Sequence, residues 1–375
     1  MKFVVPGKPF QQQLSAMSRV INSKNALPIL DNFLLSLNGD VLIVTGSDSE
    51  TVMTSRIEVV DAEGSGEVAI PSKTLLEIAK EIGNQPITFE MDDDTLQIKV
   101  SYLNGQFDLM GVNAADYPRR GDETQEGSRV FTLPAAMLLK GIDNTIYAVA
   151  TDTLRPMMTG IFWDIDENHI TFVASDTHKL VKYTNSLGAP GFRGGFILPS
   201  KPAAIMRNIL GSEENDVEVR MDDRGATFRA GNYTLSCKFI KGNYPNYNRV
   251  IPKDNPYHIT VDREGLLNAV RRVSLFASKA TCLVKLTVSG GSLHIEGRDI
   301  DYSTSAEENV PCSYDGQPMT IGFNSGFMTD ILTNLKCTDV LISLSDPARP
   351  GIFEPLTQEE GENVVVLQMP MQVID

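Results

Sequence analysis

The chain repeats one pattern of strand, polar cap and helix three times within its 375 residues. In the first two copies, Pro71 and Pro199 stand 128 positions apart, and each precedes a serine, a lysine and a stretch with apolar residues three and four apart. A third copy begins at Gly322, where an apolar run again leads into a short polar cap and a helical pattern. Self-similarity at a fixed period predicts one repeated structural unit, so we expect three related domains.

A second landmark recurs with nearly the same spacing. Asp48, Asp176 and Asp299 each end a strand-like run, at intervals of 128 and 123 residues. A catalytic residue has no reason to appear three times, so we expect each aspartate to form a structural turn. Tyr117-Pro118 and Tyr244-Pro245 close the first two copies in the same way.

Each copy is expected to contain two helices and several short strands. Turn residues such as Asn38-Gly39 separate the alternating apolar runs, which is typical of antiparallel hairpins. We therefore expect an α+β fold, with two helices packed on antiparallel sheets in each domain. The expected domains are residues 1–125, 126–252 and 253–375, and the expected helices are 9–22, 74–82, 134–149, 202–210, 263–276 and 326–335.

Charge is segregated along the chain. The sequence has 33 Lys and Arg against 48 Asp and Glu, a formal net charge of −15, which alone disfavours a nucleic-acid partner. Yet the windows 1–30, 177–212 and 265–295 contain thirteen basic residues and no acid, which leaves −28 for the remaining sequence. Basic helices from three repeats, arranged round an axis, could follow a phosphate backbone without reading bases. The alternative is that each window is an ordinary solvated face.

Several classes of protein are disfavoured. No apolar run is long enough to span a bilayer, the N-terminus lacks the apolar core of a signal peptide, and four scattered cysteines fit a reducing cytoplasm. Phosphate-binding loops, nucleophile elbows and metal-ligand spacings of His and Cys are missing, so we expect no catalytic residue, no metal and no cofactor. Asp92-Asp93-Asp94 is expected to form a turn between two strands.

Five sequence elements, taken in order, carry a family resemblance. They are Leu27 to Leu35, Ser175 to Leu180, Tyr244-Pro245 with Arg249 to Pro252, Ile321 to Asn324, and Met369-Pro370-Met371. Over essentially the whole chain, this order and spacing resembles the bacterial DNA sliding clamp, the beta subunit of DNA polymerase III.

The resemblance implies a head-to-tail homodimer that forms a six-domain ring around duplex DNA, with the helices lining the hole. An interface between two different surfaces closes into a ring when its rotation closes. By the resemblance, Phe107 and Leu109 of one copy meet Leu275 and Phe276 of the other. The alternative is that all four are ordinary core residues.

The resemblance also implies an apolar pocket that binds linear peptides of partner proteins, between the second and third domains. Methionine adapts to varied partners, which suits such a pocket. Two residues depart from the family pattern, Gln368 and Gln372, so peptide preference is expected to differ. The matching positions are Met158, Thr177, His178, Lys179, Leu180, Pro245, Arg249, Val250, Met369, Pro370 and Met371.

DNA contact is expected to be weak, salt-sensitive and independent of sequence. Ser200 and Asn208 are neutral where the family has basic residues. The matching basic positions are Lys24, Lys73, Lys80 and Lys201, and the charge windows add Arg207, Arg271, Arg272 and Lys279.

These expectations define a non-catalytic processivity clamp for DNA replication. Its expected partners are double-stranded DNA, the DNA polymerase III catalytic subunit, an ATP-dependent clamp loader and other proteins with a clamp-binding motif, and its expected location is the cytoplasm. One alternative is a protein-binding scaffold with no role on DNA. Another is a hydrolase with an unrecognised pair of carboxylates, for which the sequence offers no candidate pair.

Overall fold

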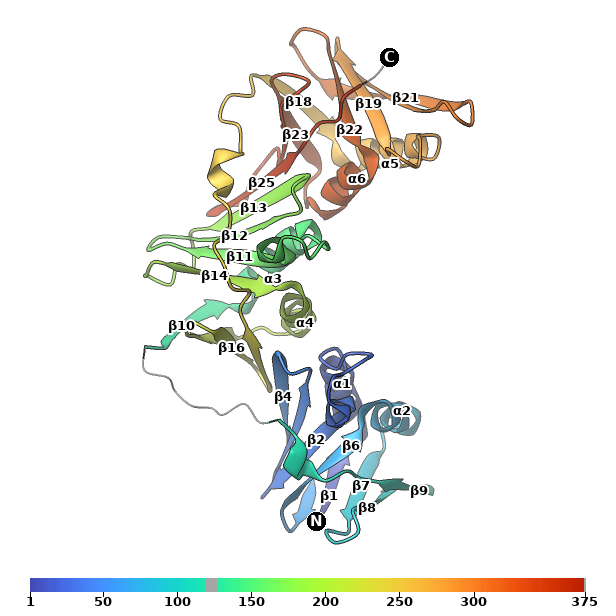
Figure 1. The fold of residues 1–375 in the computed structure, drawn as a ribbon, viewed down its shortest axis with the longest axis vertical. Helices are drawn as coiled ribbons and strands as arrows, with labels where there is room; N and C mark the ends of the chain where they lie inside the picture. The colour runs from blue at the N-terminus through green and yellow to red at the C-terminus, as the bar shows by residue number, and fades with distance from the viewer. Residues whose placement is uncertain (119–126, 374–375) are drawn as a thin grey trace. The chain divides into compact units, whose positions relative to one another are not determined.

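The computed structural model describes residues 1–118 and 127–373 (Figure 1). Within them lie six α-helices of 10 to 12 residues, each directly after a β-strand. None of these helices is long and apolar enough to cross a lipid bilayer. The helices are α1 (Gly7–Met17), α2 (Ser72–Ile82), α3 (Ala135–Thr145), α4 (Ser200–Leu210), α5 (Arg263–Ser274) and α6 (Ser325–Asn334).

The contacts divide the chain into two compact units, and each is described by itself. Unit 1 contains Met1–Leu139 and Lys201–Phe239, and unit 2 contains Lys140–Ser200 and Ile240–Asp375. The middle repeat therefore contributes strands to both units. The expected first boundary, near residue 125, lies at the edge of residues 119–126, which are outside the described part, and the three domain ranges stay predictions.

Unit 1 contains a five-stranded sheet of order β5-β1-β7-β8-β9 and an eight-stranded sheet of order β10-β15-β16-β17-β4-β3-β2-β6. Every strand pairing recorded in both sheets is antiparallel, as the hairpin signals predicted. The strands are β1 (Lys2–Pro6), β2 (Asn32–Asn38), β3 (Val41–Ser47), β4 (Thr51–Glu58), β5 (Asp61–Glu63), β6 (Gly66–Pro71), β7 (Pro86–Met91), β8 (Gln97–Tyr102), β9 (Gly105–Met110), β10 (Arg129–Pro134), β15 (Asp216–Met221), β16 (Gly225–Ala230) and β17 (Tyr233–Lys238).

Unit 2 contains one twelve-stranded sheet of order β14-β11-β12-β13-β25-β24-β23-β18-β21-β20-β19-β22, also with antiparallel pairings. The strands are β11 (Gly160–Ile165), β12 (Ile170–Ser175), β13 (Lys179–Asn185), β14 (Gly194–Pro199), β18 (Tyr257–Asp262), β19 (Leu283–Ser289), β20 (Ser292–Asp299), β21 (Thr304–Ser313), β22 (Met319–Asn324), β23 (Asp339–Leu344), β24 (Gly351–Pro355) and β25 (Glu362–Gln368).

The helices cover one face of the sheets in each unit. Figure 1 shows α1 beside α2 in unit 1 and α5 beside α6 in unit 2, and both pairs are in contact. Helix α1 buries Phe10, Leu14 and Met17, which recur at helical spacing. The expected fold class, two helices packed on antiparallel sheets in each repeat, is confirmed.

The helix ends differ from the expected ones at specific residues. The helices expected at 9–22, 134–149 and 263–276 end earlier, at Met17, Thr145 and Ser274. Near each end a hydroxyl donates back to a carbonyl of the preceding turn, as when Thr145 Oγ1 donates to the Gly141 oxygen at 2.6 Å. Such local bonds compete with continuation of the helix. Similar bonds run from Ser18 Oγ to the Ser15 oxygen and from Ser274 Oγ to the Arg271 oxygen.

The expected polar caps are also only partly present. Asn324 caps α6, because its Oδ1 accepts from the backbone N–H groups of Gly326 and Phe327. Ser72 does not cap α2; its hydroxyl donates to the Asp31 carbonyl at 2.7 Å.

The recurring aspartates form turns, as predicted. Oδ1 of Asp48 accepts backbone N–H groups two and three residues later, at 3.0 and 2.7 Å. Asp176 and Asp299 make the same pair of bonds. Asp92 does so between β7 and β8, which confirms a turn at that acidic triplet.

One strand pairing in each unit joins two copies of the repeat. In unit 1, β4 of the first copy pairs with β17 of the second, with Thr51 opposite Cys237; we call this the first joint. In unit 2, β13 of the second copy pairs with β25 of the third, with Lys179 opposite Gln368; we call this the second joint. In both joints, the strand that follows an aspartate turn pairs with the last long strand of the next copy.

Candidate DNA and partner interfaces

Helix α2 carries two of the predicted DNA-contacting side chains. Lys73 and Lys80 are exposed, whereas Leu75, Ala79 and Ile82 are buried on the other side of the helix. The spacing that buries the apolar residues therefore directs both ammonium groups to solvent.

Two more predicted lysines are exposed outside the helices. Lys24 lies in the loop after α1, and Lys279 follows α5. Within residues 1–118 and 127–373, neither these two nor the lysines of α2 enter an ion pair. Their charge is thus available to an external anion.

Lys201, in contrast, is engaged inside unit 1. Its ammonium group donates to the Asp48 carboxylate and to the Val20 carbonyl, both at 2.5 Å. It also donates to Asn22 Oδ1 at 2.6 Å. Three acceptors use the three donors of this ammonium group, so a phosphate would have to displace one of them.

The predicted arginines also differ in availability. Arg272 forms a two-pronged ion pair with Glu308, at 2.5 and 3.0 Å. The Glu308 carboxylate raises the pKa of Arg272, and this pair neutralises its charge locally. Arg271 donates to Thr333 Oγ1 at 3.2 Å, and Arg207 is exposed near the end of α4.

An apolar cluster lies at the second joint, on the face of the sheet to which Leu180 and Leu367 point. We call it the outer cluster. Its members come from the second and third copies of the repeat, as a site between two domains requires. They are Val173, Leu180, Tyr247, Ile352 and Leu367, with Phe162, Tyr244, Ile251 and Val365 packed against them.

Many of the predicted peptide-binding residues lie at or next to the outer cluster. Leu180 belongs to it. Pro245 follows Tyr244, and the pair Arg249–Val250 lies between Tyr247 and Ile251 in sequence. The exposed Val250, 53% accessible, thus adjoins a buried apolar base.

The predicted C-terminal residues are attached to the same sheet by backbone bonds. Met369 N–H donates to the His178 carbonyl at 2.8 Å, next to the pairing of β13 with β25. Met371 N–H donates to the Gly322 carbonyl at 2.8 Å. Pro370, between these two methionines in sequence, is half-buried.

His178 and Lys179 point elsewhere. The His178 ring stacks on Phe327 of α6, with the two ring centroids 5.4 Å apart. Lys179 Nζ lies 4.5 Å from the same ring and pairs with Asp176 and Asp330. Their shared contact with Phe327 of α6 places both side chains on the helix-covered face, and Leu180, the strand neighbour of Lys179, points to the other face.

Gln368 lies on that helix-covered face too. It is fully buried and donates to the Asn324 carbonyl at 2.9 Å. Its departure from the family pattern therefore does not reach the outer cluster, whereas Gln372 is exposed. Thr177, in the aspartate turn with φ of 79°, and half-buried Met158 are the remaining predicted positions.

The sequence reasoning missed the aromatic base of the outer cluster. Phe162 and Tyr244 are stacked, with centroids 5.0 Å apart. Tyr247 donates to Asp164 Oδ2 at 2.6 Å, and burial raises the pKa of its hydroxyl, which keeps this donor protonated at neutral pH. The recurrence of Tyr117-Pro118 as Tyr244-Pro245 was a signal for Tyr244, but nothing in the spacing identified Tyr247.

Among the described residues, the paired strands of the first joint are more polar on the corresponding face. Val52 corresponds to Leu180, and it faces Ser236 where Leu180 faces Leu367. The next outward-facing pair is Thr54 with Thr234. The outward face therefore has hydroxyl groups next to the first joint, in the eight-stranded sheet, and apolar side chains at the second, in the twelve-stranded sheet.

No group of three or more His, Cys, Asp or Glu that could hold a metal ion occurs among the described residues.

The predicted dimer residues are partly accessible. Phe107 and Leu109 are half-buried on β9, and Leu275 and Phe276 are exposed just after α5.

Three family models match consecutive parts of the chain. They describe the N-terminal, central and C-terminal domains of the DNA polymerase III beta subunit, over residues 1–120, 132–246 and 248–372. The chain belongs to the DNA polymerase III beta subunit family.

Full-length relatives agree with this membership. Beta sliding clamps from Pseudomonas putida and Escherichia coli K12 are each 26% identical to the chain, over 377 and 374 residues, with all of both chains covered. A solved DNA polymerase sliding clamp from Pseudomonas aeruginosa matches over 100% of both chains, with 25% identity and a TM-score of 0.92.

The beta subunit family consists of sliding clamps, which are non-catalytic processivity factors in DNA replication, and this is the role of the chain. Association with DNA and with DNA polymerase III belongs to that role. The recurring aspartates form structural turns, which is a structural and not a catalytic role.

Proposed function

We propose that the chain acts as a head-to-tail homodimer whose ring encircles duplex DNA and tethers the replicative polymerase. The observation that carries this proposal is the repetition of the joints. Two joints inside the chain use strands that follow the first and second aspartate turns. The strand after the third turn, β21, and the last long strand of the first copy, β9, are the two that remain.

Both remaining strands have a free edge. Strand β9 ends the five-stranded sheet, and within residues 1–118 and 127–373 it pairs only with β8. Strand β21 pairs with β20 along its length, but on its other side it meets β18 only at Cys312 and Ser313. In the described part of the chain, residues 304–311 thus have one unpaired edge. Pairing of β21 in one copy with β9 of another would repeat the internal joints and satisfy both edges.

Partly or fully exposed apolar side chains near these edges support the same contact. Phe107 and Leu109 lie on β9, and Leu275, 77% accessible, and Phe276 follow α5 in the copy of the repeat that carries β21. Exposed large apolar residues grouped at an edge are typical of an interface. We therefore assign these four residues to the contact between copies.

DNA contact is proposed to use the free ammonium groups of the helix-covered surface. Lys24, Lys73, Lys80 and Lys279 are the strongest candidates, since they have no ion pair in the described chain. Arg207 and Arg271 are secondary, and Lys201 and Arg272 would first have to leave Asp48 and Glu308. Weak contacts suit a sliding ring, because retention comes from encirclement.

The outer cluster is proposed to bind an extended apolar peptide of the DNA polymerase III catalytic subunit. Its aromatic base, together with the exposed Val250 and Met369, offers apolar contact with few polar groups to fix a sequence. Other clamp-binding proteins would use the same surface in turn. Opening of the ring by an ATP-dependent loader and a cytoplasmic location complete the proposal.

Two measurements test this function. Light scattering should give twice the chain mass of 41.2 kDa, and a monomer at micromolar concentration would contradict the ring. Protein loaded on a nicked circular plasmid should be released when the plasmid is linearised, because a ring can slide off an end. Retention that does not depend on DNA topology would contradict encirclement.

A further inference from the structure

The two internal joints share one further contact beyond their paired strands. In the first joint, Lys238 N–H donates to the Glu50 carbonyl at 3.2 Å. In the second, Met369 N–H donates to the His178 carbonyl at 2.8 Å. In each joint, the residue at or just after the end of the last long strand thus meets the aspartate turn of the preceding copy.

Hairpin registers identify the equivalent residue in the first copy. Strands β16 and β17 close with Ala230 opposite Tyr233, and β8 and β9 close in the same way with Tyr102 opposite Gly105. Counting from these loops, Met110 corresponds to Lys238. Met110 is 59% accessible, so its side chain is free to contact another molecule.

The aspartate turn of the third copy differs from the other two. Two residues separate Asp48 from Thr51 and Asp176 from Lys179, whereas four residues, 300–303, separate Asp299 from Thr304. The longer turn carries Ile300 and Tyr302, which are 76% and 80% accessible. Asp299 holds the turn in shape, since its Oδ1 accepts from the N–H groups of Asp301 and Tyr302.

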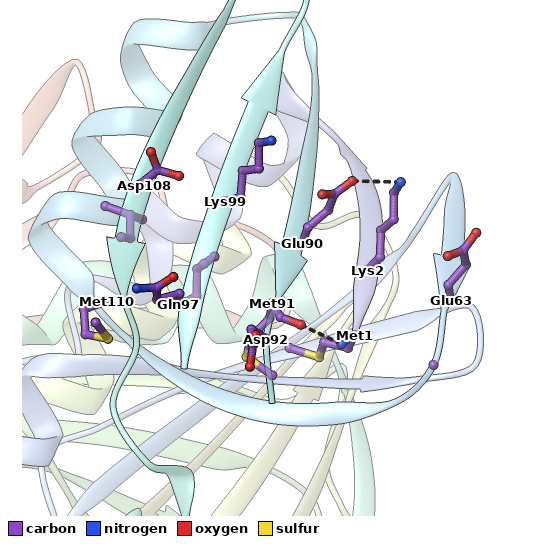
Figure 2. Close-up of a pocket in the computed structure, with 13 residues that line it drawn as sticks. Met1, Lys2, Glu63, Glu90, Met91, Asp92, Gln97, Lys99, Asp108 and Met110 are labelled. Carbon is purple, nitrogen blue, oxygen red and sulfur yellow. Dashed lines mark hydrogen bonds and ion pairs between the residues drawn. The ribbon is translucent and has the colours of Figure 1, made fainter. Parts of the chain in front are cut away.

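A trough beside Met110 provides space for large side chains. It lies on the uncovered face of the five-stranded sheet and has a volume of about 1100 Å³. Figure 2 shows Met110, Gln97, Met91 and Met1 along one end of it. Farther along the strands, Lys2, Glu90, Lys99 and Asp108 line it, and Lys2 pairs with Glu90 at 2.8 Å. Methionine thioethers are concentrated at the end where β9 stops, which suits contact with apolar and aromatic groups.

The first joint indicates how the turn reaches this face. There, Lys238 Nζ lies 3.8 Å from the Glu50 carboxylate, so a turn side chain meets the outward side chain at the end of β17. In the third copy, apolar Ile300 and Tyr302 take the place of Glu50, and apolar Met110 takes the place of Lys238. The charged pair of the first joint thus corresponds to apolar side chains at the free edges of β9 and β21.

We propose that the turn at residues 299–303 of one copy docks on a second copy of this chain, with Ile300 and Tyr302 packed against Met110 at the methionine end of the trough. This inference rests on the proposed head-to-tail dimer and specifies its register. Thr304 lies opposite Leu109 and Ser303 opposite Met110, as Thr51 lies opposite Cys237 in the first joint. The contact adds three side chains to the four already assigned.

A disulfide cross-link tests the register directly. The full chain would carry Met110→Cys and Ser303→Cys, with Cys282, Cys312 and Cys337 replaced by Ser and the buried Cys237 retained. Directly opposite residues in paired strands have Cβ atoms close enough for a disulfide. Mild oxidation should give a covalent dimer in high yield. The matched control, Leu103→Cys with Ser303→Cys, uses the exposed hairpin loop before the far end of β9 and should stay uncross-linked.

Dimer dissociation constants separate this inference from the proposed function. Tyr302→Ala and Met110→Ala should each weaken the dimer by on the order of tenfold, and the double variant by less than the product of the two. Leu154→Ala, at a residue 86% accessible in a loop, should leave the constant unchanged. A parent dimer that is unaffected by Tyr302→Ala and Met110→Ala, or that cross-links equally through Leu103→Cys, overturns the docking and leaves the ring intact. A parent chain that stays monomeric overturns both.

Discussion

Lys201 at the start of α4 pairs with the carboxylate of Asp48, which belongs to the aspartate turn of the preceding repeat. The Asp48 side chain is largely buried and the Lys201 side chain is about one-third exposed, so the pair is shielded from solvent on its acidic side. A lysine that the sequence assigns to DNA therefore also holds the first joint together.

We expect Asp48→Asn to destabilise the protein by about 1–2 kcal/mol, because the ammonium group of Lys201 loses its charged partner. Asparagine keeps an Oδ1 for the turn, so the loss reports on the ion pair. Chemical denaturation measures the change in the free energy of unfolding. Asp94→Asn is the control, since this exposed carboxylate has no such partner among the described residues, and an equal effect of both changes would exclude the assigned role of the pair.

The four unpaired lysines should dominate the salt dependence of DNA binding. Replacing both Lys73 and Lys80 by Gln should reduce the slope of log affinity against log salt by about two, because each lost phosphate contact removes roughly 0.9. Fluorescence anisotropy with a duplex oligonucleotide measures the slope. Arg272→Gln should change it less, since Glu308 already neutralises that guanidinium. A larger effect at Arg272 than at the two lysines would refute this ranking.

Peptide binding should depend on the outer cluster and not on the helix-covered face. Val250→Asp should weaken binding of the DNA polymerase III catalytic subunit at least tenfold, because a charge enters an apolar contact. His178→Ala should have a smaller effect, since its ring stacks on Phe327. Surface plasmon resonance on the intact dimer measures both. If His178→Ala has the larger effect, the site extends to the face that the helices cover.

Glu354 should make stability depend on pH. Burial raises the pKa of this carboxyl above its ordinary value of 4.5, with His258 opposing the effect. The ionised form therefore costs stability at neutral pH, and this cost disappears as the pH falls through the raised pKa. Glu354→Gln should raise the Tm at pH 7 by on the order of 1–3 °C.

The gain from Glu354→Gln should shrink below the raised pKa, where the parent carboxyl is protonated as well. Glu360→Gln, at an exposed position, is the matched control and should leave the Tm unchanged throughout. A constant gain across the pH range would mean that the change acts through packing and not through ionisation.

The repeat made much of the fold predictable. Asp48, Asp176 and Asp299 form the expected turns, and all six helices occur where apolar spacing indicated. The helix ends were harder to predict from the sequence. They depend on local hydrogen bonds, such as that from the Thr145 hydroxyl to the Gly141 carbonyl, which apolar periodicity does not indicate.

The site was predictable in part. The family resemblance led to Leu180 and Met369, but it grouped them with His178 and Lys179, whose side chains face α6. Which face a residue takes depends on strand register, which sequence spacing near a turn does not determine. The resemblance also assigned Lys201 to DNA, but its acceptor Asp48 is 153 positions away in sequence, so the ion pair could not be read from local spacing.

Encirclement of DNA is tested by comparing retention on circular and linear duplexes. The protein is loaded on a nicked circular plasmid by a clamp loader and ATP, freed of unbound protein by gel filtration, and divided into two samples. One is cut once by a restriction enzyme and the other is left circular. We expect the protein to stay on the circle and to leave the linear duplex within minutes, because a ring can slide off a free end. Equal retention on both forms would contradict encirclement.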